Sequence, residues 1–332
     1  MPFSKDLIIS YFADLDMPLA EATRLQFFYN DMNSDAEKYA FVKNVGSKTR
    51  LSDGKVRVHW ILALTYLLPI FIIRTHFFKK STWVYGPNDS LLLNVMAKLL
   101  KAERIFTDGQ DVHLALNDKN HKPFLYIGHP DSDSEVGKCI IPTLEEDWAQ
   151  NYRTPFTNLD VISIGYMSHF SLGKGILDIC QALQHLPESL QKKVTFHVAS
   201  NSVSDDISVR EAYDIFSNDF SGNIRTLGKV DPYLFMREMD IYIYPFHSKK
   251  NTFNVPFTLL EASLSGTFVV GPNLKNVRPW LTVDSLVEPR DPESLSTVIQ
   301  MALYNKDRSI EIIKMNNKRI LKSVRLIREN RL

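Results

Sequence analysis

The chain has 332 residues, of which 44% are hydrophobic, and its formal net charge is +1. This length allows two domains of ordinary size, each with a real hydrophobic core. A charge so close to zero argues against a general nucleic-acid-binding protein, which would usually be strongly basic. The two cysteines, Cys139 and Cys180, show neither a disulfide framework nor a metal-ligand spacing, so we expect buried thiols in a reducing compartment.

The first half of the chain carries an irregular series of strand and helix patterns. Residues 6–15, 81–89, 104–108 and 124–130 are predicted strands, and residues 90–103 have the apolar spacing of a helix. Lys5 and Asp6 interrupt the N-terminus before any long apolar run, so no secretory signal is expected. These patterns predict an α/β domain that ends in the polar stretch near residues 150–158.

The most apolar segment, residues 60–73, is too short to span a bilayer and contains Pro69. Basic residues flank it on both sides, namely Lys55, Arg57, Arg74, Lys79 and Lys80. Two interpretations remain open: a helix that rests on anionic lipid, or a buried core helix of the first domain. We therefore expect a cytoplasmic protein, which in the first case would be peripheral at the membrane surface.

The second half alternates regularly between strand and helix patterns. Predicted strands lie within residues 158–168 (ending at Gly165), 192–200, 223–230 (ending at Gly228), 241–246 and 267–273. Predicted helices cover residues 175–186, 207–220, 232–240, 257–266 (ended by Gly266), a segment from Pro292 to residue 305, and the basic tail 314–332. This alternation predicts a parallel sheet with helices on both faces, and ligands then bind at the carboxyl ends of the strands.

A single acidic residue, Glu261, lies in an otherwise apolar and small-residue stretch, residues 256–273. The loop 249–257 leads into its helix, and the unpaired N–H groups and dipole of a helix N-terminus bind anions. A carboxylate one turn further along would repel a phosphate but can accept hydrogen bonds from the two hydroxyls of a ribose. Together these features indicate a nucleotide site. The alternative is that Glu261 only caps or solvates its helix.

A second candidate is Lys174, which with Gly175 opens the helix after the strand that contains Gly165. A lysine at a helix start is slightly unfavourable unless an anion is present, because the helix dipole repels it. We interpret Lys174 as a phosphate contact. The alternative is a solvated lysine at a helix start.

The ordered motifs are Gly165, Lys174-Gly175, "IRTLGKV" (224–230), "MREMDIYIYPF" (236–246) and "FNVPFTLLEASLSGTFVVGPN" (253–273). In this order, residues 158–300 resemble the nucleotide-sugar domain of GT-B glycosyltransferases, in particular the retaining family four. The resemblance implies two Rossmann-like domains that face a cleft. An acceptor-side domain would cover residues 1–155, a donor domain residues 156–312, and a C-terminal helix, residues 313–332, would pack back on the first domain.

The resemblance also implies roles for single residues. Lys174 would contact the donor diphosphate and Glu261 would hold the nucleotide ribose. Backbone amides around residues 256–259, with Thr258 and Leu259 among them, would cradle the distal phosphate. The loop Gly228–Val230 would border the base, while Gly165 and Asn254 occupy further motif positions of the donor site. No metal or other cofactor is expected, because Lys174 and the helix dipole would stabilise the departing diphosphate.

In the donor site, Asn254 stands where the family pattern has a glycine, and the chain also departs from the pattern at two residues that normally contact the donor. Phe253 stands where a first motif glutamate normally contacts the donor sugar, and Tyr166 stands where an arginine normally shares the diphosphate with the lysine. Residues that could substitute are His169, His247, Lys249, Lys250 and Asn251. Near the reacting centre of the first domain, the family's histidine has two candidates, His113 and His129.

The expected activity is transfer of a sugar from a nucleotide diphosphate sugar to a glycan or lipid-linked glycan, with retention and without a metal. The two departures leave open a catalytically impaired relative that binds nucleotide sugar or partners an active subunit. A GT-B sugar-nucleotide epimerase or a phosphorylase is a further alternative. The expected partners are therefore a nucleotide sugar and a glycan or lipid-linked acceptor, with no nucleic acid.

Overall fold

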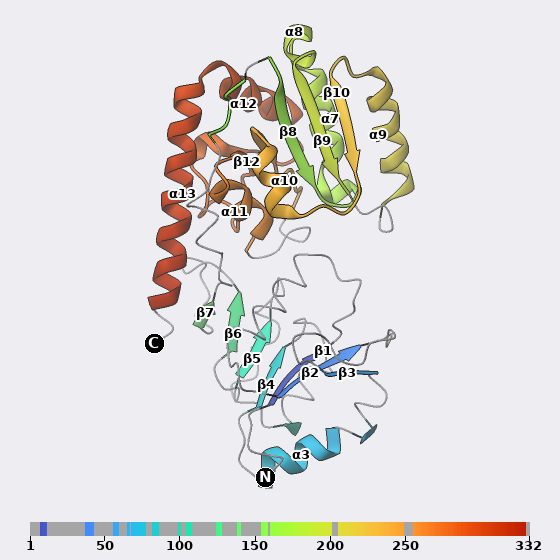
Figure 1. Cartoon of the computed structure of the whole chain (residues 1–332), viewed down its shortest axis with the longest axis vertical. Coiled ribbons are helices and arrows are strands. Elements are labelled where there is room, and N and C mark those ends of the chain that lie inside the picture. The colour runs from blue at the N-terminus through green and yellow to red at the C-terminus, as the bar shows by residue number, and fades with distance from the viewer. Residues whose placement is uncertain are drawn as a thin grey trace. The chain divides into compact units, whose positions relative to one another are not determined.

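The structure is a computed structural model of the chain. It describes residues 154–158, 160–200, 205–248 and 255–329, with side chains up to residue 325, and short helix and strand segments before residue 154. The chain divides into two compact units, residues 1–143 with 327–332, and residues 144–326. Each unit is described by itself (Figure 1).

The first unit contains a seven-stranded sheet in the order β3-β2-β1-β4-β5-β6-β7. Its strands are β1 Leu7–Tyr11, β2 Glu37–Val42, β3 Val56–His59, β4 Thr82–Tyr85, β5 Arg104–Thr107, β6 Phe124–Ile127 and β7 Lys138–Ile140. All neighbours pair in parallel. The predicted strands β1, β4, β5 and β6 are confirmed. The sequence patterns did not reveal β2, β3 and β7.

Helix α3, Leu68–Phe77, begins inside the apolar segment of the first half and extends beyond its end at residue 73. Pro69 lies in its first turn, where a missing N–H costs no helical hydrogen bond. Phe71 is buried, whereas Ile70 and Ile73 are 47% and 53% exposed. None of the helices in the described part of the chain is long and apolar enough to cross a lipid bilayer.

The second unit contains a six-stranded parallel sheet in the order β10-β9-β8-β11-β12-β13. The strands are β8 Ile162–Met167, β9 Val194–Ala199, β10 Asn223–Leu227, β11 Ile241–Ile243, β12 Phe268–Pro272 and β13 Leu286–Val287. The helices are α7 Ile176–Gln184, α8 Glu188–Gln191, α9 Ile207–Asp219, α10 Pro232–Glu238, α11 Phe257–Leu264, α12 Pro292–Tyr304 and α13 Lys306–Glu329. The predicted strand–helix alternation and parallel sheet are confirmed.

Helices cover both faces of this sheet, as the alternation of side chains along β8 shows. Ile162, Ile164 and Tyr166 belong to a buried core that also takes in residues of α7, α9 and α12. Gly165 points to the opposite face, where an added Cβ would lie 2.6 Å from the Met239 Cγ at the end of α10. The sheet is therefore doubly wound, with α7, α9 and α12 on one face and α10 and α11 on the other (Figure 1).

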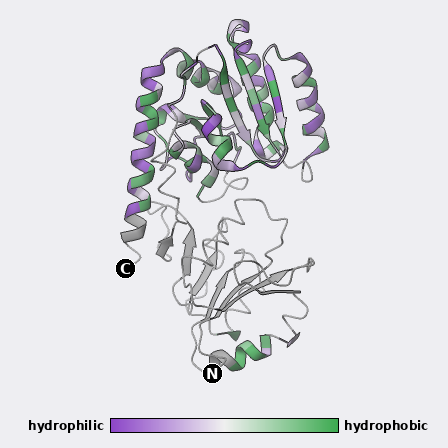
Figure 2. Ribbon diagram, viewed as in Figure 1, coloured by the Kyte–Doolittle hydropathy of each residue, from purple (hydrophilic) through white to green (hydrophobic). Residues whose placement is uncertain are grey.

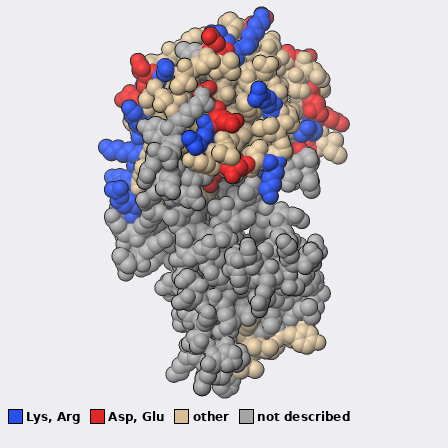
Figure 3. All heavy atoms as spheres, in the orientation of Figure 1, with Lys and Arg blue, Asp and Glu red and all other residues tan. Residues whose placement is uncertain are grey.

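The long helix α13 alternates hydrophilic and hydrophobic residues along its length (Figure 2). Ile312 and Ile313 are buried in the core of the second unit, and the Thr282 N–H donates to Asn316 Oδ1 at 2.7 Å. Because the helix starts at Lys306, the expected boundary at residue 312 falls inside it. Over the second unit, basic and acidic side chains are interspersed in the view of Figure 3.

Candidate functional site

The centre of the second sheet is the point where the strand order reverses. From β8 the chain continues outward to β9 and β10, and from its neighbour β11 it continues in the other direction to β12 and β13. In doubly wound sheets, ligands bind beyond the carboxyl ends of the strands at such a switch point. The loops after β8 and β11 are therefore the first place to look for a site.

The structure brings these two loops into direct contact. Gly175, which precedes α7, has a φ of 71°, and an added Cβ would lie 2.0 Å from the Pro245 carbonyl oxygen in the loop after β11. The His247 N–H donates to the Gly173 carbonyl at 3.1 Å. Only glycine satisfies both the left-handed backbone and this close approach. The two loops are thus packed as one piece.

Lys174 lies within this contact, as the last residue of a 3-10 helix, Leu172–Lys174. Its side chain is half-buried, and its Nζ lies 4.2 Å from the centroid of the Phe246 ring. Phe246 in turn stacks on Tyr244, with ring centroids 4.0 Å apart. A cation on an aromatic face retains its charge. Lys174 is therefore presented at the switch point as a positively charged group.

An Asp–His–Arg group joins the start of α7 to the loops that follow β11 and β13. His247 Nε2 lies 2.7 Å from Asp178 Oδ2 in the first turn of α7, and the Arg290 Nε–H donates to His247 Nδ1 at 3.3 Å. Because Nδ1 accepts, we assign the proton to Nε2, which donates to the carboxylate. Burial raises the pKa of Asp178, while His247 and then Arg290 act in the opposite direction. The sequence interpretation missed Asp178 and Arg290, since they come together only in three dimensions.

Tyr166 does not take the place of the family's arginine. We expected the strand to end at Gly165, but β8 continues through Met167, so Tyr166 is a strand residue. Its side chain is fully buried, and its hydroxyl donates to the His169 carbonyl at 3.1 Å. Side chains alternate along a strand, and this register turns Tyr166 into the core. The structure likewise explains Gly165 by its packing against Met239 and Phe235.

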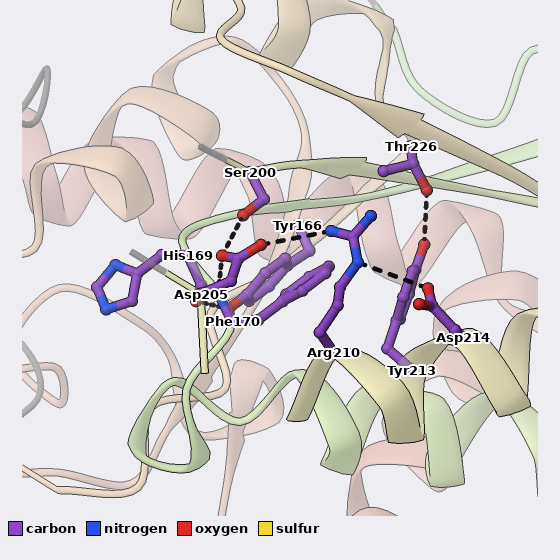
Figure 4. Close-up of polar contacts among 9 residues, drawn as sticks. All are labelled: Tyr166, His169, Phe170, Ser200, Asp205, Arg210, Tyr213, Asp214 and Thr226. Atoms are coloured by element: carbon purple, nitrogen blue, oxygen red, sulfur yellow. Dashed lines mark hydrogen bonds and ion pairs between the residues drawn. The ribbon is translucent and has the colours of Figure 1, made fainter. Parts of the chain in front are cut away.

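A second polar group, centred on Asp205, fixes the loop that carries His169 and Lys174 (Figure 4). Asp205 Oδ1 accepts from the Phe170 N–H at 2.7 Å and from the Ser200 hydroxyl at 3.0 Å. Its Oδ2 accepts from Arg210 at 3.3 Å, and only 6% of the Asp205 side chain is exposed. The loop after β8 is thus anchored to the end of β9 and to α9. No sequence pattern indicated this group.

His169 lies on this anchored loop, between the Tyr166 and Asp205 contacts. In Figure 4 its imidazole points away from the Asp205 group. Burial, and then the charge of Lys174, lower the pKa of His169, while Asp205 acts in the opposite direction. The ring therefore favours its neutral form next to Lys174.

The N-terminus of α11 lies at the same edge of the sheet, because it follows β11. Its N-cap is Pro256, which makes no side-chain capping hydrogen bond. The Leu259 N–H, expected in the phosphate cradle, donates to the Pro256 carbonyl at 3.0 Å, and the Leu259 side chain is fully buried. Thr258 and Glu261 are half-buried on the first turns of the helix. Both residues act on the buried Tyr242 of β11. Burial raises the pKa of Tyr242, a hydrogen bond with the Thr258 side chain lowers it, and the charge of Glu261 raises it further.

The remaining expected donor residues fall into two groups. Gly228 is exposed directly after β10, an added Cβ there would meet nothing within 4 Å, and Val230 is half-buried. The residues Asn254, Phe253, Lys249, Lys250, Asn251, His113 and His129 lie outside the described residues. Within the described part of the chain, no group of three or more His, Cys, Asp or Glu residues could hold a metal ion.

Comparison with known proteins defines the class of fold first. The structure is similar to Alr3699/HepE from Anabaena in complex with UDP and glucose, with a TM-score of 0.71, 12% identity, and 98% of this chain and 99% of that chain covered. It is also similar to a glycosyltransferase from Rickettsia africae (TM-score 0.70, 14% identity, 98% and 97% covered). A sucrose-phosphate synthase from Thermosynechococcus elongatus gives a TM-score of 0.68 at 12% identity, with 96% and 95% covered. The fold is that of GT-B glycosyltransferases, as predicted.

Comparison of the sequence with protein-family models then narrows the class of glycosyltransferase. Residues 160–305 match the family model described as Glycosyl transferases group 1. This match confirms the resemblance that the ordered motifs indicated, over nearly the same residues, and family four is compatible with it. No curated protein matches the chain.

Proposed function

We propose that the protein transfers a sugar from a nucleoside diphosphate sugar to a glycan or lipid-linked glycan, with retention and without a metal. The observation that carries this proposal is the arrangement of Lys174 and the α11 N-terminus at the carboxyl edge of the sheet, beside its switch point. The match to glycosyl transferases group 1 supports it, and so do the similar structures whose bound ligands are UDP, UDP with glucose, and UDP-glucose.

In this proposal, the donor diphosphate lies between Lys174 and the first turn of α11, while Glu261 accepts hydrogen bonds from the ribose. The ammonium group and the helix N-terminus stabilise the negative charge that develops as the diphosphate departs. An acceptor hydroxyl attacks the anomeric carbon while the bond from this carbon to the diphosphate oxygen breaks, and the hydroxyl proton passes to the departing diphosphate. The rigid contact between the loops after β8 and β11 holds Lys174 in position before the donor arrives, which reduces the cost of ordering it.

For the acceptor, we propose a lipid-linked glycan reached from the membrane surface. This part of the proposal is supported by the exposure of Ile70 and Ile73 on α3. Flotation with vesicles of phosphatidylglycerol and phosphatidylcholine tests it. Replacement of both residues by aspartate should abolish vesicle binding, and equal binding by the variant would contradict a membrane role for α3.

A second candidate is an impaired relative that binds the donor but does not transfer it. The burial of Tyr166 favours this candidate, because it removes the residue expected at the family's arginine position from the diphosphate. One assay separates the candidates. UDP, GDP and ADP sugars are incubated with the protein, free nucleotide and transferred sugar are measured by mass spectrometry, and isomerised donor, which has an unchanged mass, is measured by proton NMR.

Each outcome of this assay has a separate meaning. Released nucleotide diphosphate together with a glycosylated acceptor supports the transferase. Binding in a thermal-shift screen without release of nucleotide supports the impaired relative, and conversion of the donor without an acceptor supports an epimerase. If none of the three nucleotide families raises the Tm, the proposed donor site is wrong.

A further inference from the structure

The backbone of Arg290 adopts a conformation that only glycine adopts without strain. Its φ is 63°, in the left-handed region, which costs about 1–3 kcal/mol for a residue with a side chain. Two contacts hold it there: the Arg290 main chain hydrogen-bonds to the Asp178 carboxylate, and its Nε–H donates to His247 Nδ1 at 3.3 Å. Strain that the surroundings hold in place is concentrated at functional sites.

The position of Arg290 relative to the strands also bears on its role. It follows β13, so its loop leaves the carboxyl edge of the sheet two strands away from β11. Its side chain nevertheless reaches His247, in the loop after β11, whose own N–H holds the loop of Lys174 through Gly173 at 3.1 Å. The guanidinium group is thereby placed at the switch point, next to the contact that positions Lys174.

We propose that Arg290 binds the diphosphate of the sugar donor and that His247 and Asp178 position its guanidinium group for this purpose. The inference rests on the donor site proposed above and names a residue for the role that the buried Tyr166 cannot fill.

The chemistry of the guanidinium group fits this role. Arg290 is exposed, and its Nε is occupied by His247. Among the described residues, its two terminal nitrogens have no hydrogen-bond or ion-pair partner. A guanidinium fork binds phosphate oxygens through two parallel hydrogen bonds, which a lysine cannot do.

An alternative role for Arg290 is purely structural, as a partner of Asp178, and the backbone strain makes the two roles separable. Arg290→Gly removes the guanidinium group and relieves the strain, because glycine accepts a positive φ. A structural role predicts a lower Tm for this variant. A ligand-binding role predicts a Tm that is equal or higher, together with weaker binding of the diphosphate.

Isothermal titration of the full chain with UDP, UMP and inorganic pyrophosphate tests the proposal. For Arg290→Gly we expect the Kd for UDP and pyrophosphate to rise about tenfold or more, as for the loss of a charge-assisted hydrogen bond. The Kd for UMP should change less than that for UDP. Arg290→Lys should recover part of the loss, and His247→Ala should raise the Kd for UDP in the same direction.

Arg237 supplies the matched control, because it is an arginine of the same unit whose guanidinium group lies on Tyr233 of its own helix. Arg237→Gly should leave the Kd for UDP unchanged. If Lys174→Ala weakens UDP binding but Arg290→Gly does not, the assignment of Arg290 is wrong and the donor site stands. If the wild-type chain binds neither UDP nor pyrophosphate, the donor site itself is wrong, and the role of Arg290 falls with it.

Discussion

Replacement of Gly175 by alanine should damage both stability and donor binding, because it disturbs the contact between the loops after β8 and β11. A residue with a side chain at a φ of 71° costs about 1–2 kcal/mol. The new Cβ would lie 2.0 Å from the Pro245 carbonyl oxygen and 2.9 Å from the Pro245 carbonyl carbon. Comfortable contacts begin near 3.5 Å, so one loop must move by about 1.5 Å.

Relieving such an overlap costs about 1–3 kcal/mol, since the obstacle is backbone and not the end of a flexible side chain. A combined loss of about 3 kcal/mol would lower the Tm by about 6–12 °C in a domain of this size. Lys174 precedes the altered residue and moves with its loop. We therefore expect the Kd for UDP to rise about tenfold or more, which corresponds to at least about 1.4 kcal/mol.

Differential scanning calorimetry and UDP titration measure the two effects. Gly228→Ala is the control for stability, because an added Cβ at Gly228 meets no atom within 4 Å. Its Tm should stay within about 2 °C of the wild-type value, as expected for a surface substitution. If Gly175→Ala unfolds at the wild-type Tm and binds UDP as the wild type does, the two loops are not packed as described.

Three further predictions concern the scaffold around the site. Gly165→Ala should lower the free energy of unfolding, measured by urea denaturation, by about 1–3 kcal/mol, because its Cβ would lie 2.6 Å from Met239 Cγ. The double variant with Met239→Ala should lose less stability than the two single variants lose in sum. Asp205→Ala should cost about 1–3 kcal/mol, since it leaves the Phe170 N–H without its buried acceptor, while Arg210 keeps Asp214 as a partner. A loss below about 0.5 kcal/mol would contradict the anchoring role. Burial lowers the pKa of His169 and of His197 in the folded state. As the pH falls below about 6.5, these histidines therefore take up protons in the unfolded chain before they do so in the folded one, and the folded state loses stability. Urea titrations between pH 7.5 and 5.5, as a chosen range around that value, should show this decline, and His197→Gln should reduce its slope.

The sequence predicted the second unit well because its signals are local. Period-2 and helical patterns placed β8 to β12 and their helices, and Lys174-Gly175 was correctly located at the start of α7. The end of β8 was misplaced, since Gly165 looked like a strand terminus when it is a strand residue that makes room for Met239. Whether Tyr166 faces solvent or core depends on that register, so its burial could not be foreseen.

The groups built from distant residues could not be predicted at all. Asp178 comes from the first turn of α7, His247 and Arg290 come from two separate loops, and Asp205 joins the ends of two strands to a helix. No local pattern in the sequence reports such contacts, because they follow from the order of the strands in the sheet.

The central claim is that Lys174 and Glu261 hold the diphosphate and the ribose of one nucleotide. Isothermal titration of the wild-type chain, Lys174→Ala and Glu261→Ala with UDP and with inorganic pyrophosphate tests it most directly. The lysine variant should lose affinity for both ligands, whereas the glutamate variant should lose affinity for UDP and keep its affinity for pyrophosphate. UDP binding that is unchanged in both variants would show that the nucleotide lies elsewhere.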